Sequence, residues 1–167
     1  MAEQRQRVEI YATFMKVTGD ITLLEPERLS DAINRFGNFL ELTNAHVEPL
    51  SVRYPVLSRA ESSATIAKSA VILVSPVGDS APPSTKLWRE KLPYSAAINT
   101  QAFSMVADIH LEPRTTLREH LDRYRGDFIP VTNISALWVA ALTAETNALQ
   151  RPFALLNPAA ILSFSVR

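Results

Sequence analysis

The sequence predicts an α+β fold, mainly β, in which two related units follow one another along the chain. The prediction rests on segments rich in β-branched and aromatic residues, on a short helix-like segment in each half, and on an internal similarity between the halves. We expect each unit to be a small bent sheet or a partly open Sm-like or SH3-like barrel with one short helix. The two units are then expected to pack as a pseudo-symmetric pair.

The first element expected is a β-hairpin. The segments "VEIYATFMKV" and "DITLL" are rich in β-branched and aromatic residues, and they flank a turn signal formed by Thr18, Gly19 and Asp20. The corresponding segment of the second half, "AAINTQAFSMVADIHL", repeats this pattern more weakly. Each unit is therefore expected to open with two antiparallel strands.

A short helix is expected next in each half. In "EPERLSDAINRFG", Pro26 suits a first helical turn and Gly37 stands where a left-handed residue would cap the helix. In the second half, Thr116 and Glu119 have the spacing of a capping box, and Gly126 follows the helix. The apolar residues between these signals recur at helical spacing.

The remainder of each unit is expected to be about three strands. After the helices come "NFLELTNAHVEPLSV" and "DFIPVTNISALWVAAL", which contain Asn44 and Asn133 at points where a turn or bulge is tolerated. Each half then ends in an apolar strand, "IAKSAVILVSP" or "ALLNPAAILSFSV". The predicted order in each unit is strand, strand, helix and about three further strands.

The halves align with two constant offsets that differ by one residue, which predicts a tandem duplication. The aligned pairs include Asp20 with Asp108, Arg35 with Arg123, Phe39 with Phe128, Asn44 with Asn133 and Ile72 with Ile161. The predicted units span residues 6–78 and 94–167. A linker at 79–93 follows Gly78 and begins with the breaker sequence "DSAPPS", and we expect its second half, with Trp88, to pack as a strap.

Composition restricts the partners. The 167 residues include 17 Lys and Arg and 17 Asp and Glu, so there is no overall positive field to favour nucleic acid or an anionic membrane. No cysteine is present, and no apolar run approaches the roughly 20 residues needed to cross a bilayer. We expect a soluble cytoplasmic protein without a cofactor, whose partner is a protein; a homo-oligomer is an open alternative.

The first unit resembles a family of small bacterial domains of unknown function. The resemblance is carried by a strand that ends in "GDI", then "RLSDAIN", "FLELTNA" and "SAVILVSP". The second unit departs from this pattern in its helix, where "LREHLDR" replaces "LSDAINR". The resemblance implies a bacterial, β-rich module and transfers no catalytic residue.

The aligned polar pairs are the first candidate site. Asp20 and Asp108 would act as acid and base if pseudo-symmetry brought their carboxylates together. Each also begins a predicted strand segment where Asp commonly bonds nearby backbone, and the turn role is favoured. Asn44 and Asn133 have the same two interpretations, and again the turn role is favoured.

The histidines are the second candidate. His120 lies between Glu119 and Asp122, a combination that can bind a metal or support catalysis. The first half has Asp31, Ala32 and Asn34 in the matching places, so a solvated helix face is favoured, and no catalytic or metal-binding residue is predicted.

Three functions remain. The first is a non-enzymatic protein-interaction or regulatory module. The second is a small-ligand binding protein or simple enzyme with a pocket between the units, and its lining residues would be Trp88, Tyr94, His110 and Trp138. The third is RNA binding by an Sm-like barrel, which the mixed charges around the helices disfavour.

Overall fold

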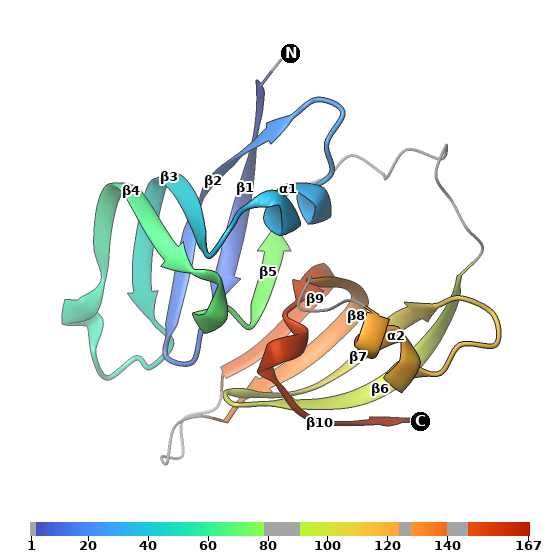
Figure 1. Ribbon diagram of the computed structural model, residues 1–167. Helices are drawn as coiled ribbons and strands as arrows, with labels where there is room; N and C mark the ends of the chain where they lie inside the picture. The colour runs from blue at the N-terminus through green and yellow to red at the C-terminus, as the bar shows by residue number, and fades with distance from the viewer. Residues whose placement is uncertain (1–2, 79–90, 124–127, 140–146) are drawn as a thin grey trace.

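The computed structural model describes residues 3–78, 91–123, 128–139 and 147–167 (Figure 1). Within them the strands form one antiparallel sheet in the order β10-β6-β7-β8-β9-β5-β1-β2-β3-β4. The strands of the N-terminal half are β1 Glu3–Tyr11, β2 Met15–Leu24, β3 Phe39–Pro49, β4 Arg59–Ala67 and β5 Leu73–Pro76. Those of the C-terminal half are β6 Leu92–Thr100, β7 Phe103–Leu111, β8 Ile129–Trp138, β9 Asn147–Leu156 and β10 Ile161–Val166. The α-helices are α1 Leu29–Arg35 and α2 Leu117–Arg123, and 3-10 turns occur at Pro55–Leu57, Lys68–Ala70 and Pro158–Ala160.

The predicted fold class is wrong. The described residues form one large, mostly β sheet of ten strands that is not closed, since β4 and β10 remain as its two edges. The cause is β5, which pairs with β1 on one side and with β9 on the other. The two halves of the sheet therefore join through a main-chain ladder, and they do not pack as two separate barrels. The short helix in each half is the part of the prediction that fits.

The strands follow the alternation of their sequences. In β2, buried and partly exposed positions alternate along the strand, with Val17, Ile21 and Leu23 buried. Gly19 takes the inward place between the first two. A Cβ atom at this glycine would lie 3.0 Å from the Cβ atom of Leu42 on β3, so the close approach of the two strands requires glycine.

The helix ends confirm one sequence prediction and contradict another. The Glu119 carboxylate accepts a hydrogen bond from the Thr116 backbone N–H at 2.8 Å, and the Thr116 hydroxyl accepts one from Glu119 N–H at 3.3 Å, so the predicted capping box is present. Gly37 does not have the predicted left-handed conformation. Helix α1 ends instead at Arg35, and the backbone of its C-cap residue Phe36 is no longer helical, with φ −59° and ψ 141°. Gly126 lies outside the described residues.

Two clusters of buried residues form the core, one mainly in each half of the sheet, and each borrows residues from the other half. Phe128 and Leu155 belong to the cluster beneath α1, β1 and β5. Tyr11, Ile72 and Leu73 belong to the cluster of the C-terminal half. Figure 1 shows β5 at the boundary between the halves, with α1 and α2 on either side of it. The exchange of core residues binds the halves together.

The two halves share the same order of strands. In the N-terminal half the order is β5-β1-β2-β3-β4, and in the C-terminal half it is β10-β6-β7-β8-β9. In each half, the helix follows the second strand of that half, so α1 follows β2 and α2 follows β7. The duplication and the unit boundaries remain predictions from the sequence, and residues 79–90 of the expected linker lie outside the described residues. Within the described part of the chain, no helix has the length and apolar character to span a membrane.

Candidate functional site

Asp20 and Asn44 lie together in a β-bulge between β2 and β3. The register of these strands shifts between Thr18 and Asp20, and Asn44 has a left-handed φ of 49°. The Asn44 side-chain amide donates to one Asp20 carboxylate oxygen at 2.9 Å. Arg7 donates to the other oxygen and to the Asn44 carbonyl, each at 3.1 Å. These groups fix the bulge. The turn that the sequence predicts at Thr18, Gly19 and Asp20 is wrong, because β2 runs through these residues and the chain turns at residues 12–14 instead.

Asp108 and Asn133 form a second bulge, between β7 and β8. The register shifts between Val106 and Asp108, Asn133 has a φ of 51°, and its amide donates to Asp108 at 2.7 Å. Ser95 on β6 stands opposite Asp108, just as Arg7 on β1 stands opposite Asp20. The second bulge thus has the same Asp and Asn pair with a serine in the place of the arginine.

The structure does not bring the two carboxylates together. Asp20 lies on β2 and Asp108 on β7, and the strands β8, β9, β5 and β1 stand between them in the sheet. At a strand spacing of roughly 4.8 Å, the two carboxylates are on the order of 20 Å apart. An acid and base pair made of these residues has no geometric support.

The expected ligand-binding residues do not converge either. Trp138 is 2% exposed, and its indole N–H donates to the Thr13 carbonyl at 2.8 Å. It lies opposite Phe103 at one end of β7, whereas His110 lies near the other end, with its Nε2 2.8 Å from the Thr132 hydroxyl. Tyr94, on β6, is exposed. Trp88 is outside the described residues.

The histidine cluster of α2 is also not a metal site. His120 is 6% exposed, so it faces the core side of the helix, and the predicted solvated face is wrong for this residue. Burial lowers the pKa of His120, and the nearby charge of Lys91 lowers it further. Glu119 and Asp122 are exposed. In the described ranges, no three His, Asp or Glu side chains gather in a way that could hold a metal ion.

A charged cluster that the sequence analysis missed lies across the junction of the two halves. Arg151 of β9 donates to the Glu9 carboxylate of β1 at 2.6 and 3.1 Å and to the Tyr11 hydroxyl at 2.9 Å. The Tyr11 hydroxyl in turn donates to Glu9 at 2.7 Å. Residues i and i+2 of a strand share a face, so the local sequence predicts that Glu9 and Tyr11 lie side by side. It does not predict that Arg151 on β9 is their partner.

The protonation states in this cluster follow from its contacts. Burial alone would raise the pKa of Glu9, but the hydrogen bonds from Arg151 and Tyr11 outweigh it and hold the pKa below its ordinary value. Burial and the bond to Glu9 raise the pKa of Tyr11. The three groups therefore form a stable ion pair with a bridging hydroxyl, which is a structural clamp and not a proton-transfer site.

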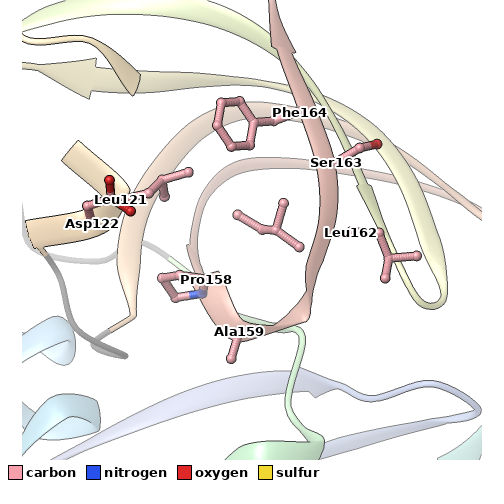
Figure 2. A pocket seen from close by; sticks show the side chains of 8 residues that line it. Leu121, Asp122, Pro158, Ala159, Leu162, Ser163 and Phe164 are labelled. Atoms are coloured by element: carbon pink, nitrogen blue, oxygen red, sulfur yellow. The ribbon is translucent and has the colours of Figure 1, made fainter. Parts of the chain in front are cut away.

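The feature best suited to binding is an open hollow of about 510 Å³ between α2 and β10 (Figure 2). Its walls present polar and apolar surface in about equal parts. They include Leu121, Asp122, Pro158, Ala159, Ile161 and Phe164. Figure 2 shows Phe164 on the side of β10 that faces α2, with Leu162 on the other side of the strand. Phe164 is 38% exposed and Leu162 is 67% exposed.

Sequence reasoning did not find this hollow, although one signal was present. The strand "ILSFSV" has large apolar residues on both of its faces, which is unusual for a strand that ends at the edge of a sheet. Such residues require a cover, and the structure shows that the described residues do not supply one.

Comparison of the chain with protein-family models, with curated proteins and with solved structures finds no match in any of the three. The resemblance to a small bacterial domain family therefore remains a prediction from the sequence.

Proposed function

We propose that this chain is a non-enzymatic protein-interaction module whose binding site is the hollow between α2 and β10. The observation that carries the proposal is the position of the hollow beside the outer edge of β10, with which no other described strand pairs. An edge strand presents backbone N–H and C=O groups to which an extended polypeptide can add. The partner that fits is an extended segment that pairs with β10 and places a large apolar side chain in the hollow.

The chemistry of the hollow supports binding over catalysis. Its lining combines large apolar side chains with polar surface, and Asp122 is its only ionisable side chain among the described residues. The polar residues that the sequence singled out are engaged elsewhere. Asp20 and Asp108 each bond to the asparagine of their own bulge. The cytoplasmic location remains a prediction from the sequence.

The test is selection of random short peptides, displayed on phage, against the full chain immobilised at low density. We expect enrichment of extended sequences with a central aromatic residue. Phe164→Glu removes the apolar wall of the hollow and is expected to abolish binding of the selected peptides. Tyr94→Glu is the matched control, because Tyr94 is 37% exposed against 38% for Phe164 and lies on the neighbouring strand β6.

Two results would contradict the proposal. One is a selection without any enriched sequence. The other is a set of peptides that bind the Phe164→Glu chain as well as the unchanged chain. Loss of binding in Tyr94→Glu alone would favour the alternative ligand site around Tyr94.

A further inference from the structure

The junction between the two halves of the sheet shows how the hollow beside a helix is filled. At this junction β5 pairs with β9 through only two register pairs, Leu73 with Leu156 and Val74 with Leu155. Phe128, which is 2% exposed, also crosses the junction and belongs to the core cluster of the N-terminal half. Phe128 of the C-terminal half thus fills the space beside α1 and β5 in the N-terminal half.

Helix α1 binds this aromatic residue through its main chain. The Asn34 side-chain oxygen accepts a hydrogen bond from the Phe128 backbone N–H at 2.8 Å, and the Asn34 amide donates to the Phe128 carbonyl at 3.3 Å. The ammonium group of Lys68 lies 5.8 Å from the centre of the Phe128 ring. We call this binding site for Phe128, formed by Asn34 and Lys68 beside α1 and β5, the socket.

The α2 and β10 hollow has the same surroundings without the phenylalanine. Strand β10 lies beside β6 as β5 lies beside β1, and α2 follows β7 as α1 follows β2. A bulge between Ile161 and Ser163 sets Phe164 opposite Ile98, in the place that Val74 has opposite Ile10. Val74 is fully buried, whereas Phe164 is 38% exposed. The socket is present and open.

The opposite edge of the sheet carries the matching phenylalanine. Phe39 aligns with Phe128 in the sequence, and it begins β3 next to the edge strand β4, as Phe128 immediately precedes β8 next to β9. Phe39 is 55% exposed, although it is a large apolar residue. On β4, the partly buried Ile66 pairs with Leu40 as Leu156 pairs with Ile129, so the exposed Thr65 takes the place of Leu155.

We propose that the occupant of the hollow is Phe39 of a second copy of this chain. Strand β4 of one copy then pairs with β10 of the next, with Thr65 opposite Phe164 and Ile66 opposite Ser163, which is the register of the β5 and β9 junction. The inference rests on the proposed function and names its partner. Because the described part of each copy has one open socket and one exposed phenylalanine at opposite edges, the contact is head to tail and extends into a ring or a filament.

The contact between copies has one hydrogen bond fewer than the internal junction. Asp122 takes the place of Asn34 by alignment. Its carboxylate can accept from the Phe39 backbone N–H, but it has no amide to donate to the Phe39 carbonyl. The hollow of about 510 Å³ is within the roughly 300–1,000 Å³ range of binding pockets, so an aromatic side chain fits.

Sedimentation velocity over roughly three orders of magnitude in concentration, starting at about 1 µM, tests the proposal. The unchanged chain is expected to associate with increasing concentration. Phe39→Asp and Phe164→Glu are each expected to remain monomeric with an unchanged melting temperature, because both residues are exposed in the single chain. Tyr54→Asp is the matched control and should associate normally, since Tyr54 is 58% exposed but lies beyond the far end of β4.

Mixing the two monomeric variants gives the decisive result. The Phe39→Asp chain keeps its open hollow and the Phe164→Glu chain keeps its Phe39, so the mixture is expected to form a complex of two chains that grows no further. If Phe164→Glu fails to fold, Asp122→Arg on the exposed face of α2 replaces it. An unchanged chain that stays monomeric, an assembly that Phe39→Asp leaves intact, or a mixture without a complex would each overturn the proposal. Peptide selection at the hollow still decides the proposed function in those cases, because it needs no second copy.

Discussion

The region between α1 and β5 and the region between α2 and β10 have the same arrangement of elements but opposite states of packing. In the first, Phe128 and Leu155 from the other half of the sheet cover Val74, which is fully buried. In the second, Phe164 takes the place of Val74 and remains 38% exposed. The difference shows that the packing around α1 is completed by Phe128 from the other half of the sheet. Under our proposal, α2 receives the equivalent residue from a second copy.

The largest effect is expected from removing the Phe128 side chain from the region between α1 and β5. Phe128→Ala should lower the free energy of unfolding by about 3–5 kcal/mol, because it leaves a cavity beneath α1. The corresponding change at the open end, Phe39→Ala, should alter it by less than about 0.5 kcal/mol, since Phe39 is exposed. Urea unfolding of dilute protein measures both. Equal losses of unfolding free energy in the two variants would show that Phe39 is as well packed as Phe128.

The next difference lies in charge. The internal junction has the ion pair of Glu9 and Arg151, whereas the corresponding positions at the edges are Ala97 on β6 and Glu61 on β4, which is opposite Ala45 as Arg151 is opposite Ile134. Glu9→Gln should lower the free energy of unfolding by about 2 kcal/mol, because the hydrogen bonds from Arg151 lose their charged acceptor. Ser62→Ala, a change at an exposed position of β4, should leave it unchanged. Urea unfolding at neutral pH separates the two.

The same ion pair predicts a pH dependence. The folded pKa of Glu9 lies below its ordinary value near 4.5, so its contribution to stability is complete above that value. As the pH falls, the unfolded chain takes up the proton first, and the contribution is lost by the pH at which folded Glu9 is protonated. The difference in unfolding free energy between the unchanged chain and Glu9→Gln should therefore shrink with acidification below about pH 4.5. A difference that stays constant between neutral and acid pH would refute this assignment.

A smaller effect is expected from the socket's hydrogen bonds. Asn34→Ala removes both bonds to the Phe128 main chain and should cost about 1–2 kcal/mol. Asp122→Ala at the open end should cost less than about 0.5 kcal/mol in the single chain, since Asp122 is exposed there. Thermal unfolding of dilute protein is the measurement. A large loss in Asp122→Ala would mean that the second socket is already filled within one chain.

Several local features could be predicted from the sequence, but which of the large apolar residues are buried could not. The capping box of Thr116 and the bulges at Asn44 and Asn133 depend on neighbouring residues, and the structure contains them. The turn predicted at Thr18, Gly19 and Asp20 is absent, because β2 continues through it. Phe39 and Phe128 have similar local sequences, yet one is exposed and the other is buried. Their difference depends on the short pairing of β5 with β9, a contact between distant segments that no local pattern records. For the same reason the single open sheet was not predicted.

The two bulges provide the smallest and most local comparison. The hydrogen bond from Asn44 lowers the pKa of Asp20 most, and the hydrogen bond and charge of Arg7 add to it. Arg7→Ser makes the first bulge like the second, where Ser95 stands opposite Asp108. We expect it to raise the pKa of Asp20 while the free energy of unfolding changes by less than about 0.5 kcal/mol, because the ion pair is partly exposed.

Asn44→Gly keeps the left-handed conformation but removes the amide, so it should raise the pKa of Asp20 by more than Arg7→Ser does. An NMR titration of the Asp20 carboxyl carbon in the two variants measures both shifts. If Arg7→Ser had the larger effect, the arginine and not the asparagine would be the main partner of Asp20. The second bulge, which has only the asparagine, would then need another explanation for its identical geometry.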